Sequence, residues 1–116
     1  LKVKQKKKGY ELLKEARRIE KAGAFSIVLE CLSTYASKLI TSNLKIPTIG
    51  IGSSLNCDGQ ILVTDDMLGI SGFYPKFVKK YAYLDRIIEK AVKKYTSEVK
   101  HKQFPNIKNI FNGRRY

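Results

Sequence analysis

AGAFSIVLECL, residues 22–32, is the stretch that decides the fold. Its larger part, residues 24–32, is rich in β-branched and large apolar side chains and has the length of a strand covered on both faces. Gly23 ends the helix that is expected before it, residues 10–22. That helix carries its apolar side chains on one stripe: Leu12, Leu13, Ala16 and Ile19. The stretch therefore predicts an amphipathic helix followed directly by a buried parallel strand.

The order of helix, turn and strand repeats downstream. Ser33 is placed to cap a second helix that runs to about Asn43, and a short strand is expected over residues 48–52. A third apolar run, residues 60–63, follows a loop rich in Ser, Asn, Asp and Gly. Such alternation with short connections predicts parallel βαβ units, whose functional groups lie at the carboxyl ends of the strands.

The C-terminal third lacks this alternation. Residues 75–81 predict a basic amphipathic turn or short helix, and residues 84–99 carry an apolar stripe that predicts a longer helix. That longer helix needs a partner surface. Residues 104–116 show no sustained period and are expected to run over the surface or to fray.

Length and composition narrow the class of protein. The chain has 116 residues with 43% hydrophobic content, which suits one domain, residues 1–116. No stretch approaches the roughly 18 to 20 apolar residues of a membrane span, and no signal-peptide core follows the basic start. The two cysteines, Cys31 and Cys57, are expected to be free thiols. We therefore expect a cytoplasmic location and no membrane partner.

The formal net charge of +13 raises nucleic acid as an alternative partner. The lysines are dispersed along the chain, and no RNP, KH, zinc-finger or helix-turn-helix signature accompanies them. A solvated lysine-rich surface is the favoured interpretation. A basic nucleic-acid-binding module stays open as the alternative, and its affinity would fall steeply with salt.

Glu30 is the sharpest candidate for chemistry. It ends an otherwise apolar strand, where a carboxylate is costly unless it is exposed, paired or functional. By the period of two it shares one face with Ser26 and Val28, while Phe25 lies on the other face. In a barrel, this arrangement would aim Glu30 inward at the top and bury the Phe25 face against helices. A partly shielded carboxylate there would serve as a general base, and a surface carboxylate is the alternative.

Two glycines and two aspartates follow near the later strand ends. Gly50 and Gly52 let a ligand approach the backbone, so they are candidates for substrate binding, with tight packing as the alternative. The segment lacks the glycine patterns of nucleotide-binding loops. Asp65 and Asp66 would point to opposite faces of a strand and seldom hold one cation together, so helix capping is the expected role of Asp66. A single histidine, His101, disfavours a zinc site and a Ser/His/Asp hydrolase.

Three blocks occur in the order and spacing of a known family. They are AGAFSIVLECL at residues 22–32, IPTIGIGSSLNCDGQILVTDDMLGI at residues 46–70 and PKFVKKYAYL at residues 75–84. Together they resemble the ketopantoate hydroxymethyltransferase (3-methyl-2-oxobutanoate hydroxymethyltransferase) family over about residues 3–111. Ser53 and Ser54 stand where that family usually has Ala and Gly.

The resemblance implies a (β/α)₈ TIM barrel that transfers a hydroxymethyl group from 5,10-methylenetetrahydrofolate to 3-methyl-2-oxobutanoate, giving ketopantoate in pantothenate biosynthesis. It implies that Mg²⁺ binds the keto acid and that the enzyme is a homodecamer. Glu30 matches the glutamate that is the family's proposed proton acceptor, and the pair of Gly50 and Gly52 is retained. The family's metal ligands belong to earlier strands, so no metal ligand is expected in this chain.

The length of the chain bears on activity. A whole barrel typically needs about 250 residues, so this chain supplies only about the last three strands with their helices. Residues 10–72 are expected to form barrel strands and helices, residues 73–103 a C-terminal helical region, and residues 104–116 an irregular tail. The chain alone is expected to be inactive and to need an N-terminal barrel half. A fragment, a split-gene product and a nonfunctional gene remnant are the interpretations left open.

Overall fold

The computed structural model describes residues 2–111 and 113. In chain order its elements are α1 (Lys2–Lys21), β1 (Ile27–Glu30), α2 (Thr34–Thr41), β2 (Thr48–Ile51), β3 (Gly59–Gln60), α3 (Thr64–Leu68), α4 (Leu84–Lys100) and the 3₁₀ turn η1 (Ile107–Asn109). The strands form one parallel sheet in the order β1-β2-β3. This arrangement confirms the α/β class. Helix α1 begins before the expected residue 10, because the lysines that precede it are good helix formers.

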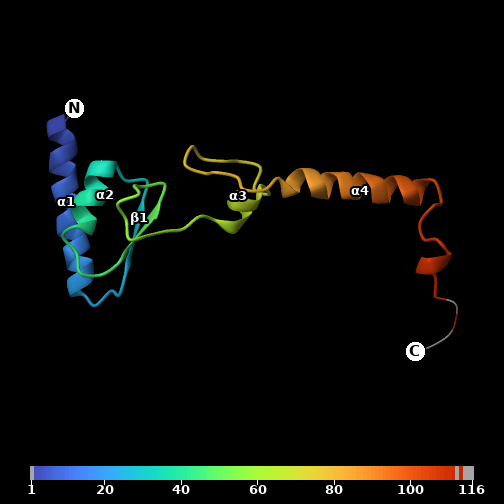
Figure 1. The fold of residues 1–116 in the computed structure, drawn as a ribbon, viewed down its shortest axis with the longest axis horizontal. Coiled ribbons are helices and arrows are strands. Elements are labelled where there is room, and N and C mark those ends of the chain that lie inside the picture. The colour runs from blue at the N-terminus through green and yellow to red at the C-terminus, as the bar shows by residue number, and fades with distance from the viewer. Residues whose placement is uncertain (1, 112, 114–116) are drawn as a thin grey trace.

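Helices α1 and α2 pack together against one face of the sheet (Figure 1). The buried cluster between them contains Leu13 and Ala16 of α1, Leu29 of β1 and Ile40 of α2. Burying a large aliphatic side chain stabilises a fold by about 1.5–3 kcal/mol. This cluster therefore holds both helices on the sheet, as the apolar stripes of their sequences predict.

The other face of the sheet is open. Val28 and Glu30 alternate with the buried Leu29, and both are exposed, Val28 to 54%. Phe25 is 88% exposed. The prediction of a strand buried on both faces is therefore wrong for the residues that the structure describes. No segment of residues 2–111 covers the Val28 side, and Phe25 lies before β1, where neither helix covers its ring.

A polar cluster fixes the amino end of β2. Thr48 is fully buried, and its N–H and hydroxyl both donate to Oδ2 of Asp58, at 2.8 and 3.1 Å. The Thr41 hydroxyl of α2 lies 2.8 Å from the Thr48 hydroxyl. Buried polar groups are tolerated when they are hydrogen-bonded. The cluster therefore joins β2 to α2 and to the loop before β3 without a buried unpaired group.

Ser33 caps the N-terminus of α2, as the sequence predicts. Its backbone is extended, and its Oγ accepts a hydrogen bond from the Ala36 N–H at 3.3 Å. Because this bond satisfies an otherwise free helix N–H, Ser33→Ala is expected to lower the free energy of unfolding by about 1 kcal/mol. Urea unfolding followed by circular dichroism measures the change. Thr34→Ala at the exposed neighbouring position is the control, and equal losses in both variants would contradict a capping role.

The chain beyond β3 leaves the sheet and forms an arm (Figure 1). Helix α4 extends away from α1 and α2, and none of its residues is buried. Its apolar stripe is confirmed, with large side chains between 43% and 63% exposed: Ile87, Ile88, Val92, Tyr95 and Val99. The radius of gyration is 24.2 Å, against about 13 Å for a compact domain of this length. Within residues 2–111, the Phe104 ring packs on Tyr95, and nothing else supplies the partner surface that the stripe needs.

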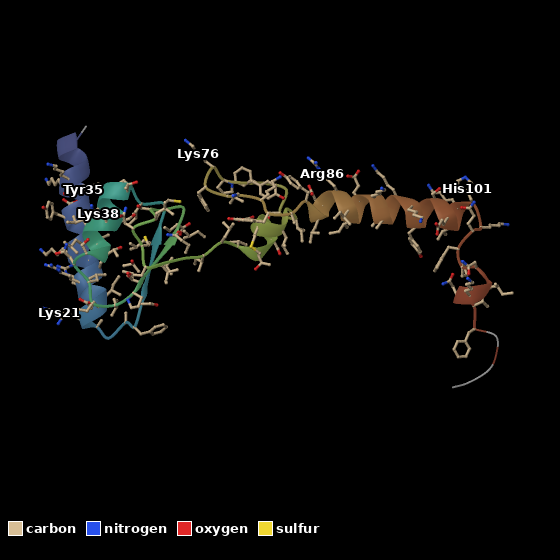
Figure 2. All side chains as sticks on the ribbon, viewed as in Figure 1. Lys21, Tyr35, Lys38, Lys76, Arg86 and His101 are labelled. Atoms are coloured by element: carbon tan, nitrogen blue, oxygen red, sulfur yellow. The ribbon has the colours of Figure 1, made fainter. Side chains whose placement is uncertain are left out.

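Residues 70–83 connect α3 to α4 without a helix. The Lys80 Nζ lies 3.6 Å from the centre of the Tyr74 ring and 5.6 Å from that of Tyr83. The guanidinium of Arg86, which Figure 2 labels at the start of α4, lies 4.8 Å from the same Tyr83 ring. Cations within about 6 Å of a ring centre are attracted to it. These contacts tie the connection to the first turn of α4.

Two further expectations concern the C-terminal part. The Val78 N–H donates to the Pro75 carbonyl oxygen at 2.9 Å, so residues 75–81 contain the predicted turn and no helix. Near the tail, the Phe104 ring packs edge-on against Tyr95, with ring centres 5.5 Å apart. Residues 112 and 114–116 of the predicted tail lie outside the described residues.

None of the helices in the described chain is both long and apolar enough to cross a membrane.

Candidate functional site

The carboxyl ends of the three strands lie at one edge of the sheet. Glu30 pairs with Ile51 in the register of β1 and β2, and Gly50 pairs with Gln60 in that of β2 and β3. In parallel α/β folds this edge is where ligands bind. The predicted site residues Glu30, Gly50 and Gly52 are therefore brought to the same edge.

Glu30 is exposed at the end of β1. Because Leu29 faces the helices, Glu30 points toward the open face of the sheet. It also borders a small hollow of about 170 Å³ beside the outer strand β1, which is lined mostly by residues of α1 and β1, among them Glu15 and Val28. It takes part in neither of the ion pairs found within the described residues. A carboxylate in this position is free to accept a proton from a bound molecule.

Ser53 fastens the chain on both sides of Glu30. Its hydroxyl donates to the Leu29 carbonyl oxygen at 2.6 Å and accepts from the Leu32 N–H at 3.0 Å. Between them, the Cys31 N–H donates to the Ile51 carbonyl oxygen at 2.9 Å. Sequence reasoning noted Ser53 as a departure from the family pattern and did not predict these hydrogen bonds. The structure shows that this serine closes the turn that follows the candidate base.

Removing the Ser53 hydroxyl tests this role. Ser53→Ala leaves the Leu29 carbonyl and the Leu32 N–H without their partner, so we expect a loss of about 1–2 kcal/mol in the free energy of unfolding. Urea denaturation monitored by circular dichroism gives the value. Ser42→Ala, at an exposed position after α2, is the matched control. A Ser53→Ala protein as stable as the wild type would show that water replaces the hydroxyl without cost.

The two glycines have different surroundings. Gly50 is buried, and an added methyl group would lie 2.9 Å from the Gln60 Oε1 and 3.1 Å from the Cys57 Sγ, which favours the packing interpretation. Gly52 has φ +60°, a left-handed conformation that favours glycine, and an added methyl group would lie 2.7 Å from the Phe77 ring. Gly52 borders a hollow beside the ends of β2 and β3, and Gly50 does not. Substrate binding by either glycine stays a prediction.

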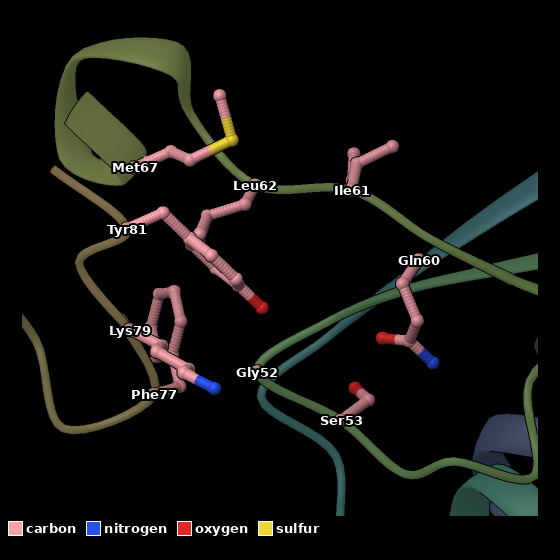
Figure 3. A pocket seen from close by; sticks show the side chains of 9 residues that line it. All are labelled: Gly52, Ser53, Gln60, Ile61, Leu62, Met67, Phe77, Lys79 and Tyr81. Carbon is pink, nitrogen blue, oxygen red and sulfur yellow. The ribbon is translucent and has the colours of Figure 1, made fainter.

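A hollow of about 600 Å³ lies beside the ends of β2 and β3 (Figure 3). One wall comes from the strand ends and the other from the connection that leads to α4. Figure 3 shows the polar ends of Lys79 and Tyr81 directed across the hollow toward Gly52. The Tyr81 N–H donates to the Met67 carbonyl oxygen at 2.8 Å, which fixes the second wall to α3. Sequence reasoning missed this hollow, because its walls lie far apart in the chain.

The aspartates do not form a metal centre with other acidic groups. Val63 is the residue before α3, and Asp65 and Asp66 lie in its first turn, so the prediction that Asp66 caps the helix is wrong. Asp66 instead accepts a hydrogen bond from the Ser71 hydroxyl at 2.5 Å. The residues that the structure describes contain no group of three His, Cys, Asp or Glu that could hold a metal ion. Both cysteines are free thiols, Cys31 exposed and Cys57 buried, as predicted.

Comparison with known proteins points to one family. The family model described as ketopantoate hydroxymethyltransferase matches residues 1–107. A 3-methyl-2-oxobutanoate hydroxymethyltransferase of Enterococcus faecalis is 52% identical over 93% of this chain and 40% of its own length. Proteins of the same name from Pseudothermotoga lettingae and Anaeromyxobacter are 54% and 46% identical over 86% and 95% of this chain. The chain spans about two fifths of the length of these relatives, 36% to 40%.

Proposed function

Because this chain belongs to the ketopantoate hydroxymethyltransferase family, we propose that it contributes the base and the C-terminal part of an enzyme that forms ketopantoate. The substrates would be 3-methyl-2-oxobutanoate and 5,10-methylenetetrahydrofolate, in pantothenate biosynthesis. The free thiols of Cys31 and Cys57 suit a reducing compartment, and we propose the cytoplasm.

The position of Glu30 carries the proposal. This carboxylate ends a parallel strand, points to the open face of the sheet and is exposed. In a (β/α)₈ barrel, the open face would be the inside, and the end of the strand would be the mouth of the active site. The exposed Val28 and the partly exposed Ile51 would then be interior barrel residues. We propose that additional strands complete a barrel over this face.

Glu30 would act on the carbon next to the ketone. Its carboxylate takes the proton from C3 of 3-methyl-2-oxobutanoate, which leaves an enolate. Water would hydrolyse the methylene unit of the folate, breaking its two C–N bonds, to give formaldehyde and tetrahydrofolate. The enolate carbon would then add to the formaldehyde carbon, and the former carbonyl oxygen would take up a proton to become the new hydroxyl. Ser53 would hold the turn after Glu30, so that the carboxylate keeps its direction while the proton moves. Gly52 would keep the backbone beside the substrate free of a side chain.

Magnesium, which the family resemblance implies, would polarise the ketone oxygen when bound. The described residues do not fit such a site by themselves, because they bring no three suitable side chains together. We propose that its ligands belong to the strands that complete the barrel.

The assembly would extend beyond one barrel. Helix α4 exposes an apolar stripe along its length, and obligate subunit contacts are commonly apolar. We propose that residues 10–72 belong to the barrel, residues 73–103 to a helical region that contacts other subunits, and residues 104–116 to a tail. The homodecamer that the resemblance implies is the proposed state of the whole enzyme.

Complementation tests the function. The chain would be co-expressed with the part of the Enterococcus faecalis relative that it does not match, and purified as a complex. Ketopantoate formation would be measured with both substrates and Mg²⁺, for the complex and for each part alone. We expect turnover by the complex only.

The alternative outcomes separate the interpretations. A stable, folded complex without turnover would favour a nonfunctional remnant over a split or partial enzyme. Turnover by the isolated chain would contradict the proposal that other strands supply essential groups. Salt-sensitive retention of nucleic acid, in place of turnover, would favour the basic binding module.

A further inference from the structure

The larger hollow has apolar walls and a single charge. Phe77 and Tyr81 present aromatic rings, and Leu62 and Met67 add further apolar surface. Among the described residues that line it, Lys79 is the only charged one. Its volume of about 600 Å³ lies within the usual range of small-molecule sites. The combination favours a ligand that is apolar over most of its surface and negatively charged at one end.

Lys79 is free to meet such a charge. Its Nζ lies 5.0 Å from the centre of the Tyr81 ring, an attractive cation–π distance that orients the ammonium group. It takes part in neither ion pair found within the described chain. Two other polar lining groups already bond the protein: the Gln60 amide donates to a backbone carbonyl at 2.9 Å, and the Ser53 hydroxyl donates to another at 2.6 Å. Lys79 is thus the lining group with unused charge.

We propose that this hollow binds a planar aromatic carboxylate, with the ring against Phe77 and Tyr81 and the carboxylate paired with Lys79. Aromatic side chains favour offset or edge-on contact with a planar ring. The bond between ammonium and carboxylate is charge-assisted and stronger than a neutral hydrogen bond. The inference rests on the chemistry of the hollow and not on the proposed transfer reaction, which depends on Glu30.

Binding can be measured without turnover. The ¹⁵N-labelled full chain would be titrated with 2-naphthoate while amide shifts are recorded by NMR. We expect saturable shifts at Gly52, Ser53 and Ile61, with a dissociation constant on the order of 1 mM or below. The neutral isostere 2-naphthamide should bind at least about tenfold more weakly, because it cannot form the ion pair.

Lysine variants locate the anion contact. Lys79→Met and Lys79→Gln are both expected to weaken 2-naphthoate binding about tenfold or more, whereas Lys76→Met, on the same connection but outside the hollow, should bind like the wild type. Equal binding by the Lys79 variants and the wild type would overturn the proposal. Shifts confined to α4 would overturn it as well, as would equal binding of hexanoate, an aliphatic carboxylate without a ring. Because no result depends on catalysis, failure here leaves the proposed reaction untouched.

Discussion

Replacing Glu30 with Gln is expected to lower kcat of the complemented enzyme by about 10²- to 10⁴-fold, the usual contribution of a general base. Glutamine keeps the length and shape of the side chain, but its amide cannot take the proton from C3 of the keto acid. KM for 3-methyl-2-oxobutanoate should change little, because the lost interaction belongs to the transition state. Steady-state rates of ketopantoate formation measure both constants.

Glu15→Gln is the matched control for this variant. Glu15 borders the same small hollow as Glu30 but projects from α1 and not from a strand end. It is expected to keep the wild-type kcat and the wild-type unfolding midpoint. A Glu30→Gln enzyme with more than half of the wild-type kcat would remove Glu30 as the base. Equal losses in the two variants would indicate a general effect of charge and not proton transfer.

The sequence predicts the fold best where several local signals agree. Around α2, the capping residue Ser33 and the helical spacing indicate the same element, and the structure confirms its boundaries within a few residues. Strand β2 begins at Thr48, as expected, directly after Pro47. These signals act between near neighbours, so one sequence contains everything needed to interpret them.

Burial could not be predicted in the same way. The apolar character of residues 24–32 indicates a strand made to be covered, but whether Val28 is covered depends on segments that pack from elsewhere. The same holds for α4, whose stripe is plain in the sequence and exposed in the structure. An apolar pattern in the sequence shows which face of a strand or helix is suited to burial. It does not show which other segment, if any, packs on that face.

In the candidate site, too, local sequence signals were predictive and long-range contacts were not. Glu30 stands out in the sequence itself, because a charged side chain at the end of an apolar strand is unfavourable unless it is exposed, paired or functional. Ser53 and Lys79 carry no such signal. Ser53 acts through Leu29 and Leu32, which are distant in the chain, and Lys79 gains its role from a hollow whose other wall is formed by the strand ends. Long-range contacts of this kind become visible only in three dimensions.

Gly52→Ala is expected to lower the free energy of unfolding by about 2–5 kcal/mol, from two separate causes. Alanine in the left-handed region costs about 1–2 kcal/mol, and Gly52 has φ +60°. The new methyl group would also lie 2.7 Å from the Phe77 ring, so the Phe77 side chain or the connection that carries it must shift, at a cost of about 1–3 kcal/mol for overpacking. Urea unfolding gives the total, and weaker 2-naphthoate binding would report that the wall of the hollow has moved.

Gly72 separates the two causes. Its φ is +78°, and nothing lies within 4 Å of an added methyl group, so Gly72→Ala reports the backbone cost alone, about 1–2 kcal/mol. The excess loss in Gly52→Ala then measures the contact with Phe77. In a Phe77→Ala background the overlap with the ring is absent and only the contact with Phe77 Cβ at 3.2 Å remains. The cost of Gly52→Ala should therefore fall toward that of Gly72→Ala, which a double-mutant cycle detects. If the cost stays the same in both backgrounds, Phe77 does not rest on Gly52, and the second wall of the hollow is held by other contacts.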